Sequence, residues 1–172
     1  MKKISLFIYL IHLFFAQSSD VETSGDIIQL AIPASGLLAA LILDDGEGQK
    51  EFAYSFATAV IFTHLMKRIV PSKRPNSDNT QSYISGHTAA AFQGAAFIHF
   101  RYGLKSAIIP YLAATFVGYS RVYSKQHHIS DVFRGCAVGI LSSYIFTSEF
   151  AEPNISIDIG EKSAKLSAFI NF

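Results

Sequence analysis

The stretch SGHTAAAFQGAAFIHF, from Ser85 to Phe100, decides the fold class of this chain. Its apolar run from Thr88 to Phe100 is too long for an ordinary strand, and apolar and polar residues do not alternate along it. Ser85 and Gly86, separated from the run by His87 alone, stand where the N-cap of a helix is expected. The stretch therefore predicts a helix.

Four further apolar segments have the same character, and turn residues separate them. They span residues 27–43, 52–66, 106–119 and 132–147. The connections contain the acidic turn 44–48, the pair Tyr102-Gly103 and the polar stretch 72–82, which follows Pro71 and contains Pro75. We therefore expect an all-α protein, an antiparallel bundle of about five core helices that occupies residues 19–150.

The two ends of the chain differ from this core. Residues 1–18 combine a basic start, an apolar run and small residues, as a secretory signal peptide does, although an uncleaved first helix is the alternative. In both cases residue 20 onward emerges outside the cytoplasm. Residues 151–172 form an amphipathic tail, in which alternation around Gly160-Glu161-Lys162 predicts a short β-hairpin.

The composition favours a membrane protein. Hydrophobic residues make up 50% of the chain and charged residues 16%, where soluble domains have about 25%. The formal net charge of +1 argues against nucleic-acid binding, and the single cysteine excludes an internal disulfide. The apolar runs are shorter than the roughly 20 residues of an ordinary span. We favour an integral bundle in the bacterial inner membrane over a soluble periplasmic one.

The polar residues that could bind a ligand or take part in catalysis fall into three clusters. They are Lys67 to Pro75, Ser85-Gly86-His87, and Ser120-Arg121 followed by His127 and Asp131. The first cluster ends one apolar segment, the second opens the next, and the third lies between the last two. Because antiparallel helices place the end of one beside the start of the next, all three should meet at one end of the bundle. The topology makes that end extracytoplasmic.

This combination of residues suits a phosphate ligand and its hydrolysis. Lys67, Arg74 and Arg121 supply cations, and amides at the helix start after Ser85 attract anions. Asp131, four residues after His127, can hold one imidazole nitrogen protonated and free the other as a nucleophile. His87 stands beside the anion site, where it can protonate a leaving oxygen.

With these residues the sequence resembles the type 2 phosphatidic acid phosphatase superfamily, over roughly residues 61–143. The signature of that superfamily is Lys-x6-Arg-Pro, then Pro-Ser-Gly-His, then Ser-Arg-x5-His-x3-Asp. The chain matches it at Lys67, Arg74-Pro75, Ser85-Gly86-His87, Ser120-Arg121, His127 and Asp131. Ile84 stands where the family has proline, which supplies no reacting group.

The resemblance implies a two-step mechanism without metal or cofactor. His127 attacks phosphorus and forms a phosphohistidine, Asp131 orients His127, and His87 protonates the leaving alcohol before activating water. The phosphate oxygens are held by Lys67, Arg74, Ser85, Gly86 and Arg121.

We therefore expect a phosphatase that acts on lipid phosphate monoesters, such as phosphatidic acid, at the periplasmic face of the membrane. The alternatives are a phosphatase of lipid diphosphates of the undecaprenyl type, a soluble acid phosphatase and a vanadium haloperoxidase. A binding protein that retained only the anion site is a further alternative. Neither the substrate headgroup nor the oligomeric state follows from the sequence.

Overall fold

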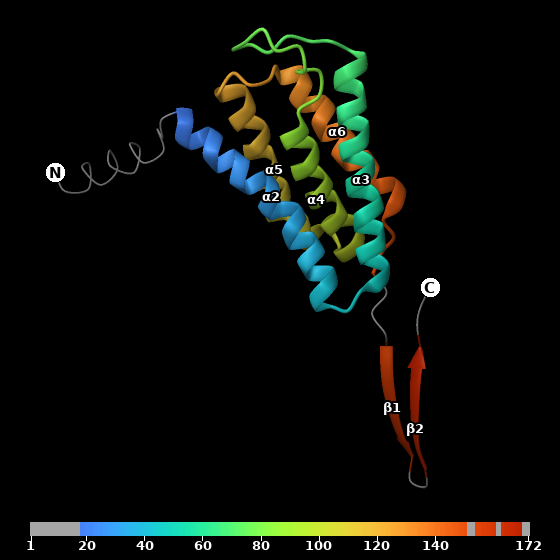
Figure 1. Cartoon of the computed structure of the whole chain (residues 1–172). Helices are drawn as coiled ribbons and strands as arrows, with labels where there is room; N and C mark the ends of the chain where they lie inside the picture. Colours follow the sequence, from blue (N-terminus) through green and yellow to red (C-terminus); the bar gives the residue numbers. More distant parts are fainter. Residues whose placement is uncertain (1–17, 151–153, 161–162, 170–172) are drawn as a thin grey trace, which may run out of the picture.

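The computed structural model describes residues 18–150, 154–160 and 163–169. The expected helical bundle is confirmed (Figure 1): its helices are α2 (Ser18–Ile42), α3 (Gly46–Ile69), α4 (Gly86–Tyr102), α5 (Leu104–Tyr123) and α6 (Ile129–Phe146). The expected signal peptide covers residues that lie almost entirely outside the described part.

The helices are longer than the apolar segments that predicted them. The largest difference is in α2, which begins at Ser18 although its apolar segment begins at residue 27. Its first turns are polar because they meet polar partners: Glu22 and Asp26 bond to side chains of Gln126 and Arg121. The sequence pattern missed this extension, since apolar periodicity marks only the part of a helix that packs on apolar neighbours.

α4 is the central helix, and the other four helices pack around it. Small residues allow α6 to approach α4 very closely: a Cβ at Gly139 would lie 2.5 Å from the carbonyl oxygen of Ala89. A Cβ at Gly94 would likewise lie 2.6 Å from the backbone of Pro33 in α2. Close packing through small residues is typical of helices that associate in membranes.

Large apolar side chains point away from the bundle. Ile27, Ile61, Ile109, Phe133 and Ile145 are all more than 60% exposed, Ile109 reaching 77%. Within the described residues, Asp20–Ile42 and Ile129–Phe146 are long and apolar enough to cross a membrane. An apolar exterior on so many helices is unusual for a soluble domain and suits a lipid environment.

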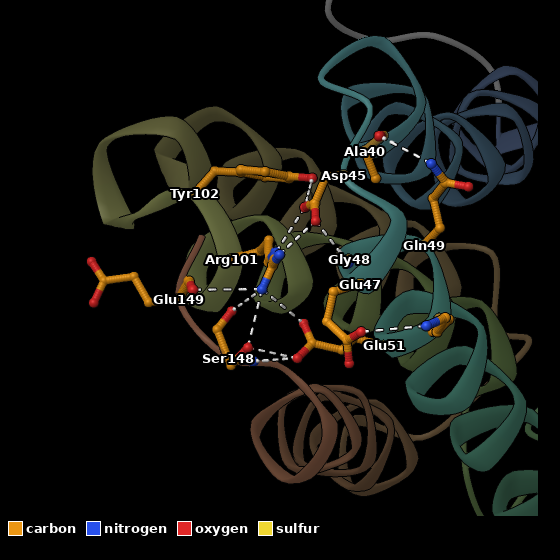
Figure 2. A network of polar contacts seen from close by, with 11 residues as sticks. Ala40, Asp45, Glu47, Gly48, Gln49, Glu51, Arg101, Tyr102, Ser148 and Glu149 are labelled. Atoms are coloured by element: carbon orange, nitrogen blue, oxygen red, sulfur yellow. Dashed lines mark hydrogen bonds and ion pairs between the residues drawn. The ribbon is translucent and has the colours of Figure 1, made fainter. Parts of the chain in front are cut away.

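A buried polar network closes the end of the bundle where α3 begins (Figure 2). Arg101, at the end of α4, donates from Nε to Asp45 Oδ2 at 2.7 Å and from Nη1 to Glu51 Oε2 at 3.3 Å. Tyr102 donates to the same Asp45 oxygen, and the Ser148 hydroxyl donates to Glu51 at 2.7 Å. The network joins the start of α3, the end of α4 and the segment after α6, so it fixes the helices opposite the candidate site.

The C-terminal residues contain two antiparallel strands, β1 (Asn154–Gly160) and β2 (Ser163–Phe169). Asn154 pairs with Phe169 at one end and Gly160 with Ser163 at the other.

Candidate active site

A polar cavity of about 170 Å³ lies at the other end of the bundle from the Arg101 network. Four predicted site residues line it: Arg74, His87, Arg121 and His127. Three further residues that the sequence did not predict also line the cavity: Glu22, Asp26 and Gln126. The helix ends that meet here are those that antiparallel connectivity requires (Figure 1).

The loop between α3 and α4 folds back on itself and carries Arg74 to the cavity. The Arg74 amide donates to the carbonyl of Asn79 at 2.9 Å, and the Ser82 amide donates to that of Ser72 at 2.9 Å. The Arg74 guanidinium donates from Nη1 to Gln126 Oε1 at 2.7 Å, while its buried Nε has no hydrogen-bond partner among the described residues. Arg74 therefore retains donors for an anion.

His127 is buried, and its Nδ1 meets a serine hydroxyl rather than Asp131 directly. Nδ1 lies 3.2 Å from Ser82 Oγ, and Ser82 donates to Asp131 Oδ2 at 2.6 Å. The direct separation of Nδ1 from Asp131 Oδ2 is 3.5 Å, at the limit of a hydrogen bond. Since Ser82 has one proton and gives it to Asp131, it accepts from Nδ1–H. This chain of bonds fixes the tautomer in which Nε2 is unprotonated.

The Asp131 carboxylate is held from several sides. Oδ2 also accepts from the His128 amide at 3.0 Å, and Oδ1 accepts from Arg134 Nη1 at 3.0 Å. The Asp131 carbonyl accepts from the Ser85 amide at 2.9 Å, which ties the start of α6 to the start of α4. Asp131 is thus a rigid anchor for both helix ends.

The electrostatic setting keeps His127 neutral. Burial, followed by the positive charges of Lys67 and Arg74, lowers the pKa of His127 to about 4, although Asp131 acts in the opposite direction. The imidazole is therefore a free base at neutral pH, as a nucleophile requires.

Ser85, Gly86 and Lys67 lie together at the start of α4. Ser85 is fully buried, and its Oγ accepts from the amide and hydroxyl of Thr88, so its own proton is free to donate. A Cβ at Gly86 would lie 3.6 Å from Lys67 Nζ, which places the ammonium beside the helix N-terminus. Burial, and then the nearby Arg74, lower the pKa of Lys67. An anion between these groups would relieve that repulsion.

Arg121 is buried, with three of its donors engaged. Nε donates to Ser120 Oγ at 3.0 Å, Nη1 to Asp26 Oδ1 at 2.7 Å, and Nη2 to the carbonyl of Glu22 at 2.6 Å. A guanidinium has five N–H donors, so two remain for a ligand in the cavity.

His87 also contacts Asp26, through Nε2 at 3.0 Å from Oδ1. Burial, Arg121 and Lys67 lower the pKa of His87, while Asp26 raises it.

All the predicted site residues thus lie in or beside one cavity. Among the residues that the structure describes, no three His, Cys, Asp or Glu side chains are grouped as a metal site.

Ser82 and Asp26 are the main residues that sequence reasoning missed. Ser82 stands in a loop rich in serine and asparagine, and Asp26 lies before the first apolar segment. Neither position belongs to the motifs, and only the fold shows what they touch.

The comparisons with known proteins agree with the motifs. Two curated relatives are similar to this chain: a lipid A 1-phosphatase of Porphyromonas gingivalis, 45% identical over 71 residues, and a lipid A 4'-phosphatase of Helicobacter pylori, 35% identical over 83 residues. These matches cover 40% and 48% of this chain, but only 16% and 42% of the relatives themselves. The chain therefore spans less than half of either relative.

A solved structure shares the fold. The crystal structure of LpxE from Aquifex aeolicus superposes with a TM-score of 0.56 at 24% identity, over 70% of this chain and 83% of that one. A family model, described as the PAP2 superfamily, matches residues 50–153, which include every motif residue. The chain belongs to the PAP2 superfamily, that of the type 2 phosphatidic acid phosphatases.

Proposed function

We propose that this protein is a metal-independent phosphatase that removes phosphate from a membrane lipid through a phosphohistidine. The observation that carries the proposal is the hydrogen-bonded chain from Asp131 through Ser82 to His127 Nδ1. It leaves Nε2 as a free nucleophile in a buried site beside three cations. A protein that merely bound phosphate would need the cations but not this arrangement.

The geometry supports a two-step reaction. His127 Nε2 forms a bond to phosphorus while the bond to the leaving alcohol breaks, and His87 gives that alcohol a proton. Water, deprotonated by His87, then displaces the imidazole and releases inorganic phosphate. Arg74, Arg121, Lys67, the Ser85 hydroxyl and the Gly86 amide stabilise the charge on the equatorial oxygens.

The apolar exterior of the bundle favours a lipid as substrate. A cavity at the end of an apolar bundle receives a headgroup from water while the acyl chains stay in the bilayer. The curated relatives are named for lipid A, so a lipid A phosphate stands beside phosphatidic acid as a candidate substrate. We propose that the site faces the periplasm, because helix α2 follows a basic N-terminus and an apolar segment.

An apolar groove beside the catalytic loop supports a lipid substrate. It has a volume of about 370 Å³ and lies where α5 and α6 pack on α4 rather than on each other. Val122, next to Arg121, and Ile129, two residues after His127, line it at the catalytic end. The remaining lining residues are Phe92, Thr115, Gly118, Tyr119, Val132, Phe133 and Cys136. We assign this groove to an acyl chain of the substrate.

The first experiment measures phosphate release from lipid A and from phosphatidic acid in detergent micelles with a metal chelator present. We expect chelator-resistant release from at least one of them, and little from the soluble ester p-nitrophenyl phosphate. Release from the soluble ester alone would point to an acid phosphatase, and release from undecaprenyl diphosphate alone to a diphosphatase. No release from any phosphate ester would contradict the proposal.

Filling the groove should impair lipid substrates selectively. Thr115 is exposed and lines the groove, so Thr115→Trp blocks it without disturbing the core. Burial of each acyl-chain methylene in the groove contributes about 0.8 kcal/mol to the binding free energy. Excluding two methylenes should therefore raise KM for a long-chain lipid phosphate about tenfold. Leu112→Trp is the matched control, because Leu112 is 67% exposed on the same helix but does not line the groove. Equal KM values for the two variants would rule out this groove.

A further inference from the structure

Helix α2 lies before the residues that match the family model, and it reaches the active site nevertheless. A single oxygen, Asp26 Oδ1, lies 2.7 Å from Arg121 Nη1 and 3.0 Å from His87 Nε2. The carboxylate thus joins a phosphate-binding arginine to the proposed proton donor. We propose that Asp26 is a positioning residue that favours the proton-donating form of His87 and holds Arg121 in place. This inference rests on the proposed function.

The approach of α2 to the site requires a glycine. A Cβ at Gly25 would lie 2.6 Å from Arg121 Nη2 and would also overlap the Ser120 side chain. Because Gly25 has no side chain, the α2 backbone comes close enough for the Glu22 carbonyl to accept from Arg121 Nη2 at 2.6 Å. The same approach places Asp26 over His87. The close approach is therefore built into the backbone of α2, and it brings the Asp26 side chain within reach of both Arg121 and His87.

The Asp26 carboxylate offsets the positive charges that otherwise surround His87. His87 faces Lys67 from α3, Arg121 from α5 and Asp26 from α2, and it shares its cavity with Arg74 and His127. Among the charged groups of the described residues that act on His87, only Asp26 favours the imidazolium. A general acid must carry its proton when the ester binds. Without Asp26, His87 would lose that proton at a lower pH.

The bonding pattern is compatible with catalysis. Protonated His87 donates Nε2–H to Asp26 and retains Nδ1–H for the leaving oxygen. In the described part of the chain, Ser120, Asp26 and Glu22 accept from three of the five N–H donors of Arg121, and two donors remain for phosphate. Each histidine thus has an acidic partner: Asp131, through Ser82, orients His127 so that Nε2 is unprotonated, and Asp26 stabilises the proton on His87.

The test is Asp26→Asn, which keeps the shape and removes the charge. An opposite charge at hydrogen-bond distance shifts a pKa by about 1–3 units, and Asp26 is half exposed, so we expect the low end of that range. The alkaline limb of the kcat profile should move about one pH unit lower, so that kcat above the limb falls about tenfold. Asp26→Glu, which retains a carboxylate, should move the alkaline limb part of the way back to its wild-type pH.

Asp20→Asn is the matched control, since it removes one exposed negative charge from the same helix. Its pH profile should equal that of the wild type. An unchanged limb in Asp26→Asn would overturn the inference. So would an unchanged kcat with tighter inhibition by inorganic phosphate, because Asp26 would then be only a competitor for Arg121.

A second measurement does not depend on turnover. NMR titration of histidine-labelled protein in detergent, with His87 assigned from His87→Gln, follows its protonation directly. Asp26→Asn should lower the His87 midpoint by about one pH unit. A wild type inactive toward every phosphate ester would overturn the proposed function, whereas an unmoved His87 midpoint would overturn only the role of Asp26.

Discussion

His127→Ala is expected to reduce phosphate release by on the order of 10⁴-fold or more, to the level of the detergent blank. The variant removes the atom that bonds to phosphorus, and neither of the other two imidazoles described near the site can replace it. His87 is engaged with Asp26, and His128 bonds through Nε2 to the carbonyl of Lys73 at 3.1 Å. The measurement is phosphate release from the lipid that the wild type hydrolyses best.

The neighbouring histidine provides the matched control. His128 is exposed at the N-cap of α6, and asparagine is a good N-cap residue, so His128→Asn should keep the helix start and most of the activity. If both variants lost activity equally, the effect would come from the loop rather than from the nucleophile. If neither did, His127 would not be the nucleophile.

The pH dependence of the wild type tests the same assignment. Because burial and two cations lower the pKa of His127 to about 4, its free base dominates above that pH. The acid limb of kcat/KM should therefore lie near pH 4 rather than at the usual histidine value of about 6.5. The phosphohistidine can be sought by quenching into alkali, followed by mass spectrometry of the peptide that contains His127.

The sequence was sufficient to predict the helices and the convergence of the motifs. Long apolar runs such as Thr88 to Phe100 are strong local signals, and antiparallel connectivity then determines which ends meet. The spacing of His127 and Asp131 placed the two side chains near each other. It could not show that Ser82 lies between them, because that serine comes from a loop 45 residues away.

The first turns of α2 were unpredictable for a related reason. Their polar residues carry no apolar period, and the partners of Asp26 are distant in sequence: Arg121 is 95 positions further on. Gly25 is one glycine among 11 in the chain, and only the packed structure shows that a side chain there would strike Arg121. Contacts between a polar helix end and a distant motif follow from the tertiary fold, not from local pattern.

Arg121→Lys should reduce kcat/KM by about 100- to 1000-fold, the usual cost of losing one preorganised donor to a transition-state oxygen. Lysine keeps the positive charge, so a purely electrostatic role would predict a much smaller loss. The guanidinium, however, binds Ser120, Asp26 and the Glu22 carbonyl at once and still has two donors for phosphate. An ammonium cannot reproduce that planar fork.

The same substitution at Arg68 separates geometry from charge. Arg68 is exposed at the end of α3 and outside the cavity, so Arg68→Lys should leave kcat/KM within about twofold of the wild type. Thermal unfolding of both variants in detergent would show whether Arg121→Lys remains folded. A folded Arg121→Lys with nearly normal kcat/KM would contradict the assignment, because charge alone would then suffice to hold the phosphate. A loss confined to kcat, with KM unchanged, would show that the fork acts on the transition state rather than on the bound ester.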